Sequence, residues 1–89
     1  MEKRYVQNSD VTSRIQDGRI YALTSDSRMF SIEEAVGVFL WELIATEART
    51  FDQILDGILS HFEVTREVAS VDIRVFIDTL VQKGLISVV

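Results

Sequence analysis

Residues 11–23 have the sequence VTSRIQDGRIYAL, in which two short runs flank Asp17-Gly18. The run 11–15 alternates apolar and polar side chains, and the run 19–23 is rich in β-branched and aromatic residues, as half-buried strands are. Asp-Gly between two such runs is a strong local signal for a tight hairpin turn. Residues 25–27 supply a second turn, and Arg28-Met29-Phe30 forms a short third strand. We therefore predict an antiparallel meander of three strands.

The rest of the chain predicts three helices, two of which begin with a similar motif. Residues 31–34 have the spacing of a capping box, in which the Ser31 side chain would accept a hydrogen bond from the backbone N–H of Glu34. Thr50 and Gln53 repeat this spacing at the start of the second helix. Behind each box, apolar residues recur at helical spacing: positions 32, 35, 36, 39, 40, 43 and 44, then 51, 54, 55, 58, 59 and 62.

The third helix has an expected start at Thr65 and an expected end at Lys83-Gly84. A cation in the last turn suits the negative end of the helix dipole, and glycine suits the left-handed residue that closes a helix. Residues 85–89 (LISVV) are apolar, and either dock on the core or add a strand. Because no proline or linker-like stretch divides the chain, we expect residues 1–89 to form one α+β domain, with residues 1–8 as a candidate flexible arm.

Composition argues against several classes of function. Cysteine is absent, which removes disulfides, thiolate chemistry and cysteine-ligated zinc. No apolar run approaches the roughly 18 residues of a membrane-spanning helix, and the N-terminus lacks the apolar segment of a signal peptide. The net charge is −5, and residues 32–89 hold ten acidic and four basic residues. This balance disfavours nucleic acid, whose phosphates need clustered cations. We expect a cytoplasmic protein with no membrane association.

The residue types needed for catalysis are not gathered in any motif. His61 is the single histidine, and its place near the end of the second helix suits an exposed side chain better than a metal ligand or a general base. The four glycines form no phosphate-binding loop. We therefore expect a protein that is not an enzyme and that uses no cofactor.

The third strand is the first of three features that suit binding. If it forms the edge of the meander, its outward N–H and C=O groups are unpaired and can accept an extended peptide by strand addition. Alternatively, the N-terminal arm or residues 86–89 cover this edge. A free edge could also pair with a second copy of the chain, so a homodimer is open as well.

The last helix and Trp41 are the other two features. A core face runs along the helix through Ala69, Ile73, Phe76, Ile77 and Leu80. Beside it lies a second stripe at helical spacing: Val68, Asp72, Val75 and Thr79. This stripe either forms one wall of a peptide groove, with the third strand as the other wall, or only widens the core contact. Trp41 lies off the main apolar stripe of the first helix, and is either a second core contact or an exposed anchor.

This layout resembles the PqqD-like family, the leader-peptide recognition domains of pathways that make ribosomally synthesised, modified peptides. The resemblance covers about residues 9–88 and includes the meander, FLWEL at 39–43, TFDQIL at 50–55 and the aromatic Phe62. It also includes VASVDIRVFIDTLVQKGLI at 68–86. The most specific part is Asp72, followed four residues later by Phe76, then by Leu80 and by Gly-Leu-Ile at 84–86.

The resemblance implies a winged-helix-like fold and a non-catalytic adaptor. In the family, a precursor's leader adds as a further strand to the third strand, and its side chains enter a groove against the third helix. Carried onto this chain, the resemblance implies peptide binding at the following positions: Arg28, Met29, Phe30, Val68, Asp72 and Val75. We add Ser31, which continues the strand, and Thr79, which continues the helical stripe. The implied second partner is a modifying enzyme, such as a radical S-adenosylmethionine enzyme, a cyclase or a leader peptidase.

Two other functions remain open at this point. A winged-helix DNA-binding regulator is the main alternative, because it shares the helix arrangement and would use the second and third helices to read DNA. Against it, Arg66, Arg74 and Lys83 are the only cations of the third helix and are set among carboxylates. A structural subunit that only stabilises a partner enzyme would need no peptide site.

Overall fold

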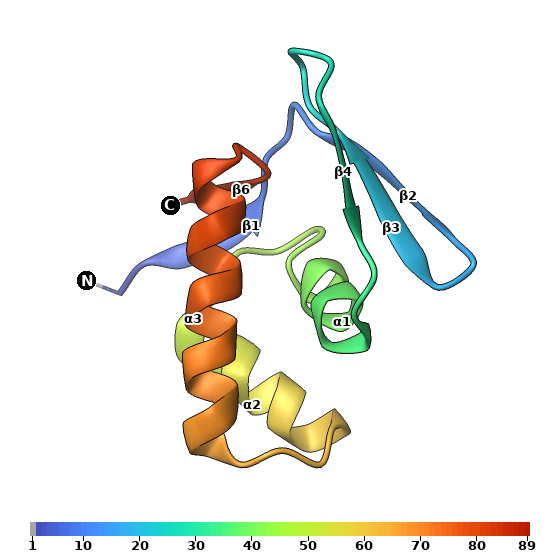
Figure 1. Cartoon of the computed structure of the whole chain (residues 1–89). Coiled ribbons are helices and arrows are strands. Elements are labelled where there is room, and N and C mark those ends of the chain that lie inside the picture. Colours follow the sequence, from blue (N-terminus) through green and yellow to red (C-terminus); the bar gives the residue numbers. More distant parts are fainter. Residues whose placement is uncertain (1) are drawn as a thin grey trace.

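Within residues 2–89, which the computed structural model describes, the chain forms six strands and three helices. Their order along the chain is shown in Figure 1. The elements are β1 (Arg4–Gln7), β2 (Thr12–Gln16), β3 (Arg19–Leu23), β4 (Met29–Ile32), α1 (Ala35–Leu43), β5 (Arg49–Thr50), α2 (Phe51–His61), α3 (Arg66–Gln82) and β6 (Ile86–Val88).

The predicted meander is present as an antiparallel sheet in the order β2-β3-β4. The turn between β2 and β3 has positive φ at both central residues, 54° at Asp17 and 76° at Gly18. This is the turn whose twist matches the twist of paired strands, and it explains why Asp-Gly predicted the hairpin. The fold class is therefore α+β, a three-stranded antiparallel sheet with three helices, as the sequence predicts.

The capping box predicted at residues 31–34 is wrong. Ser31 lies in β4 opposite Tyr21, and α1 begins only after Glu34, whose side chain makes no cap hydrogen bond. The cause lies in Ile32, which pairs with Ile20 and is 4% exposed. Burying an isoleucine stabilises the fold by about 1.5–3 kcal/mol, whereas a side-chain cap contributes about 1 kcal/mol. The strand therefore continues through the residues expected to start the helix.

A second, smaller sheet brings the two ends of the chain together, in the order β5-β1-β6. Residues 4–7 form its central strand and are not a flexible arm, because Tyr5 is buried and pairs with both Arg49 and Val88. Met1, also part of the expected arm, lies outside the described residues. Residues 85–89 both dock and add a strand: Leu85 is fully buried, and β6 pairs with β1.

The starts of α2 and α3 and the end of α3 confirm the sequence signals. The Thr50 side chain accepts from the backbone N–H of Gln53, and the Gln53 side chain accepts from the backbone N–H of Thr50, which completes the capping box. Thr65 caps α3 by accepting from the backbone N–H of Val68. The helix closes at Lys83, and Gly84 follows with φ of 79°.

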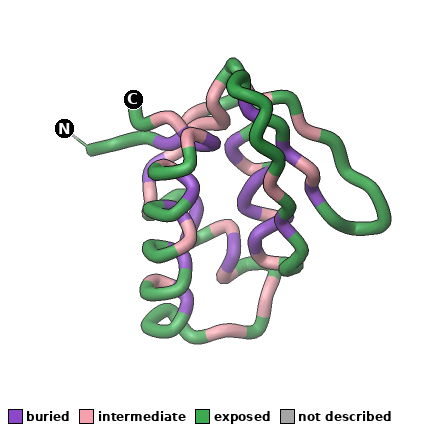
Figure 2. The backbone as a smooth tube through the Cα atoms, turned by 45° about the horizontal axis from the view of Figure 1, so that its top comes forward, coloured by how far each residue is buried: buried purple, intermediate pink, exposed green. Residues whose placement is uncertain are grey.

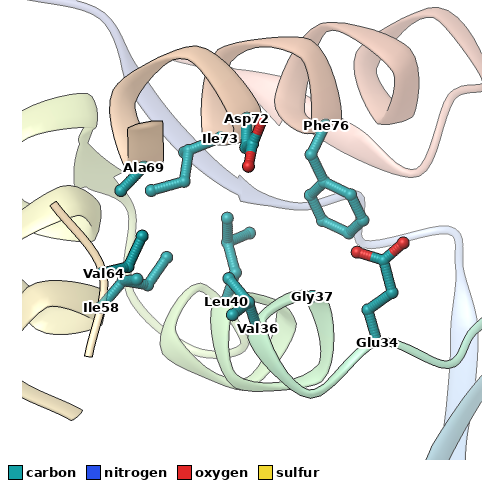
Figure 3. Close-up of a pocket in the computed structure, with 10 residues that line it drawn as sticks. All are labelled: Glu34, Val36, Gly37, Leu40, Ile58, Val64, Ala69, Asp72, Ile73 and Phe76. Carbon is teal, nitrogen blue, oxygen red and sulfur yellow. The ribbon is translucent and has the colours of Figure 1, made fainter. Parts of the chain in front are cut away.

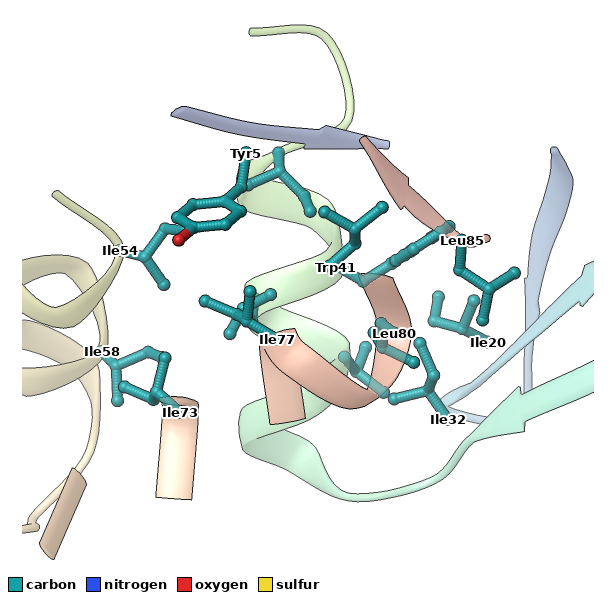
Figure 4. Packing of buried hydrophobic residues seen from close by; sticks show 14 of the residues in the cluster. Tyr5, Ile20, Ile32, Trp41, Ile54, Ile58, Ile73, Ile77, Leu80 and Leu85 are labelled. Atoms are coloured by element: carbon teal, nitrogen blue, oxygen red, sulfur yellow. The ribbon is translucent and has the colours of Figure 1, made fainter. Parts of the chain in front are cut away.

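The core lies between the two sheets and the helices, and α1 is buried at its centre. Trp41 is 1% exposed, which confirms that it is a core contact, and its indole N–H donates to the Ser13 hydroxyl at 3.2 Å. Figure 4 shows Trp41 packed among side chains from the sheets and from the end of α3. In Figure 2 the exposed residues follow the outer side of α3 and the tip of the β2–β3 hairpin. The outer side of α3 thus remains available for contacts.

Candidate functional site

The edge of β4 is open. Within the described residues β4 pairs only with β3, while β1 and β6 belong to the other sheet. In Figure 1, β4 is the strand of its sheet that lies nearest α3. Of the two arrangements that the sequence left open, the structure therefore has the uncovered edge.

The backbone groups that face this open edge can be assigned from the ladder. The N–H of Thr24 donates to the carbonyl of Arg28 at 2.9 Å. In an antiparallel pair, bonded residue pairs alternate with unbonded ones, so Phe30 and Ile32 exchange hydrogen bonds with β3. Met29 and Ser31 therefore direct their N–H and C=O groups outward, and both residues are exposed. Two residues of β4 can thus bond an added strand.

The turn before β4 is held by side-chain contacts that fix where the strand begins. The Thr24 hydroxyl bonds to the Asp26 carboxylate, and the backbone N–H of Arg28 donates to the Thr24 hydroxyl oxygen at 3.1 Å. Arg28 also forms an ion pair with Asp26 at 2.9 Å. The hydrogen bond from Thr24, and then the one from Arg28, lower the pKa of the exposed Asp26 below its ordinary value. These contacts fix the approach of the chain to the open edge.

The helical stripe predicted on α3 is exposed along its length. Val68 is 53% exposed and Val75 is 61% exposed, while Asp72 and Thr79 are also exposed. Side chains so open do not widen the core contact, and exposed valines form a surface suited to an apolar partner. We refer to Arg28, Met29, Phe30, Ser31, Val68, Asp72, Val75 and Thr79 as the β4–α3 face.

Arg28 and Phe30 contact Lys83, which lies at the end of α3. The Lys83 ammonium lies 5.0 Å from the centre of the Phe30 ring, and the Arg28 guanidinium lies 5.5 Å from it. The Arg28 side chain also donates to the backbone carbonyl of Lys83 at 3.4 Å. The start of β4 and the end of α3 are therefore joined through Phe30. The sequence marked Lys83 as a helix-end signal and as one of the few cations of the third helix, but gave no sign of its contact with Phe30, because the two residues are 53 positions apart in the chain.

Asp72 of the β4–α3 face lines a pocket of about 120 Å³ between α1 and α3 (Figure 3). Its wall opposite α3 is α1 rather than the third strand that the sequence led us to expect. Figure 3 shows the carboxylates of Asp72 and Glu34 beside it. The other lining residues are mainly apolar: Val36, Gly37, Leu40, Ile58, Val64, Ala69, Ile73 and Phe76. A cavity of about 150 Å³ can hold benzene, so this pocket suits one apolar side chain.

Phe76 joins this pocket to the end of β4. A Cβ built on Gly37 would lie 2.9 Å from the Ile32 side chain and 3.0 Å from the Phe76 ring. Ile32 and Phe76 therefore both pack against the backbone of Gly37, and they can do so because Gly37 has no side chain. Glu34, Gly37 and Phe76 were not among the predicted site residues. The aspartate-to-phenylalanine spacing of the family pattern was the one sequence signal that pointed to Phe76.

Other kinds of site find no support in residues 2–89. No group of three or more metal-ligating side chains is present there, and none of these helices combines the length and hydropathy needed to span a membrane. His61 is exposed, with its Nδ1 3.0 Å from the carbonyl of Gly57 and its ring against Phe39. None of the ion pairs among the described residues includes this histidine.

Comparison with known proteins places these features in context. The model of the family described as coenzyme PQQ synthesis protein D (PqqD) matches residues 16–86. Among solved structures, the chain is similar to TbiB1 in complex with the TbiA(β) leader peptide. The TM-score is 0.82 and the sequence identity is 26%, and the match covers 92% of this chain and 94% of that chain. No curated protein matches the chain.

Proposed function

The chain belongs to the PqqD family, and on that premise we propose that it is a non-catalytic adaptor for the leader of a precursor peptide. The leader adds as a strand to β4, and the adaptor presents the bound precursor to a modifying or processing enzyme. The observation that carries the proposal is the open edge of β4, the strand of its sheet that lies nearest α3 (Figure 1), together with the exposed stripe of α3. The likeness to a protein solved with a leader peptide supports it.

Two kinds of contact would share the binding free energy. The outward N–H and C=O groups of Met29 and Ser31 offer backbone hydrogen bonds, each with a net contribution of about 0.5–1.5 kcal/mol. These bonds are independent of the leader's side chains. An apolar leader residue that filled the pocket beside Phe76 would add about 1.5–3 kcal/mol. Main-chain pairing thus supplies a general affinity, and the pocket supplies selectivity.

The partner enzyme would carry the chemistry. The β4–α3 face offers hydroxyl groups and one carboxylate, but no histidine or cysteine to act as a base or a nucleophile. A radical S-adenosylmethionine enzyme, a cyclase and a leader peptidase are the proposed classes of partner. In each case the adaptor raises the effective concentration of the precursor at the enzyme.

A chemical-shift titration tests the proposal. The ligand is the synthetic leader of a candidate precursor peptide, and a scrambled leader is the control. We expect amide resonances of residues 27–31 and 68–79 to shift with the leader and to stay in place with the control. Shifts confined to residues 50–66 would refute the proposed site. Sedimentation of the free protein should precede the titration, because an open edge can also pair two copies of the chain.

A DNA-binding function fits the observed contacts less well. Among the α3 cations, Arg66 is paired with Asp56 at 3.0 Å, and Arg74 stacks on the Phe51 ring at 4.1 Å. Arg74 also donates to the Tyr5 hydroxyl at 3.1 Å. Since these two side chains already have partners, they would have to leave them to contact phosphates. Binding that weakened steeply with salt on a DNA duplex, and no binding to the leader, would favour the regulator.

A further inference from the structure

The β4–α3 face has a cation at one end. Lys83 lies over the Phe30 ring, and none of the described carboxylates is within ion-pair distance of its ammonium group. Arg28 lies over the same ring, but Asp26 already neutralises it at 2.9 Å. Among the described residues, Lys83 is therefore the cation without an ion-pair partner where β4 begins, and the Asp10 carboxylate lines the same pocket as Lys83, beyond ion-pair distance.

The opposite end of the same face is acidic. Asp72 and Glu34 both line the pocket between α1 and α3, and neither has a cationic partner among residues 2–89. Figure 3 shows Asp72 reaching from α3 and Glu34 reaching from the start of α1, with mainly apolar side chains around them. No basic side chain lines this pocket. The occupant that complements it is an apolar side chain with a cation close by.

The separation of the two ends sets a spacing in the ligand. Asp72 and Lys83 are eleven positions apart on one helix, which corresponds to about 16 Å at 1.5 Å per residue. An extended chain covers this distance in about five residues. Because only every second side chain of an added strand points toward α3, the charges that meet these two ends should be four or six positions apart in the ligand.

The direction of the ligand follows from the sheet. β4 runs from the Lys83 end toward α1, and both of its sheet's existing pairings are antiparallel. An added antiparallel strand would run the other way, from the acidic pocket toward Lys83. Its basic residue would therefore come before its acidic residue in sequence.

We propose that the β4–α3 face selects leader segments in which a lysine or arginine, with an apolar side chain two positions away, precedes an aspartate or glutamate by four or six positions. This inference rests on the proposed function, because it presumes an added strand. It also specifies the order of charged residues in the peptide, which backbone pairing alone does not determine.

Selection from a displayed library of random peptides about 12 residues long, enough to cover the face in an extended chain, tests the inference. We expect the enriched sequences to show the basic-before-acidic order at the stated spacing. An individual enriched peptide with its two charges exchanged should bind about three- to tenfold more weakly at low salt, since two exposed ion pairs are replaced by repulsions.

Matched variants assign each preference to its residue. Asp72→Asn should reduce the preference for a basic residue and leave the acidic preference, and Lys83→Gln should do the reverse. Asp78→Asn is the control, because this exposed side chain lies on the same helix about 120° away from Asp72. It should leave both preferences intact.

The possible failures are distinguishable. Enriched peptides that shift the amide resonances of β4 but show no charge order would overturn this inference and leave the proposed function standing. A charge order that stays the same in the Asp72→Asn and Lys83→Gln variants would also overturn this inference and leave the proposed function standing. A library that yields no binder, or binders that contact only α2, would contradict the proposed function itself.

Discussion

Replacing Ser31 by proline should abolish strand addition while the domain stays folded. The N–H of Ser31 faces the open edge, and the β4 ladder uses Phe30 and Ile32 instead. Proline at this position therefore removes a donor that none of the described residues uses within the sheet. Edge strands tolerate proline where its nitrogen faces outward. We expect the free energy of unfolding to fall by about 1 kcal/mol or less.

The expected loss of leader affinity is larger. The missing hydrogen bond contributes about 1 kcal/mol, and the leader carbonyl that faced Ser31 would be left without a donor, at a cost of about 1–3 kcal/mol if it is buried. Taken together these effects weaken binding by at least about 2 kcal/mol, or roughly 30-fold or more in Kd. Ser31→Ala keeps the N–H and removes only an exposed hydroxyl, so its Kd should stay within about twofold of the parent value.

Isothermal titration calorimetry with the leader measures both variants, and urea unfolding checks that each is folded at the titration temperature. A folded Ser31→Pro protein that binds the leader as tightly as the parent would refute the assignment of the outward N–H. An equal loss of affinity in Ser31→Ala would show that the side chain, and not the edge, makes the contact.

Three further predictions concern parts of the fold that support the site. Thr50→Ala removes the capping box of α2 and should lower the free energy of unfolding by about 1 kcal/mol in urea, with an unchanged Kd for the leader; a weaker Kd would contradict the placement of the site. Gly84→Ala should also cost about 1 kcal/mol in the same assay, because φ is 79° there and an added Cβ would contact nothing within 4 Å; no change would contradict the left-handed closure of α3. The pKa of Asp26 should lie below its ordinary value in a carbon-detected NMR titration and should rise in Thr24→Val. Because folding lowers this pKa, the ionised Asp26 carboxylate stabilises the folded state at pH values above the unfolded-state pKa, and this stabilisation is lost as pH falls through the folded-state pKa. An Asp26 pKa at its ordinary value would exclude the hydrogen bond from Thr24.

Local signals carried most of the fold prediction. Asp17-Gly18 specified the hairpin because positive φ at both positions suits few other residue pairs. Thr50 and Thr65 marked the starts of α2 and α3, and Gly84 marked the end of α3. The residues that make up each of these signals lie within four positions of one another, so the signal can be recognised in a single sequence.

Features that depend on distant pairing were not predictable in this way. Residues 4–7 pair with residues 49–50 and 86–88, and nothing in the sequence of β1 points to either segment. Ser31 carried a valid local signal that burial of Ile32 overrode. The pocket has the same origin, because Glu34 becomes a site residue only through the packing of α1 against α3. The edge strand and the exposed stripe with Asp72 were expected from the sequence, whereas Glu34 and the pocket were not.

Amide hydrogen exchange of β4 tests the central claim most directly. In the free protein the N–H groups of Met29 and Ser31 face solvent and should exchange rapidly, whereas those of Phe30 and Ile32 are bonded to β3 and should exchange slowly. With saturating leader, the account predicts that Met29 and Ser31 become protected while the other two change little. Continued rapid exchange at Met29 and Ser31 in the fully bound protein would contradict binding by strand addition to this edge.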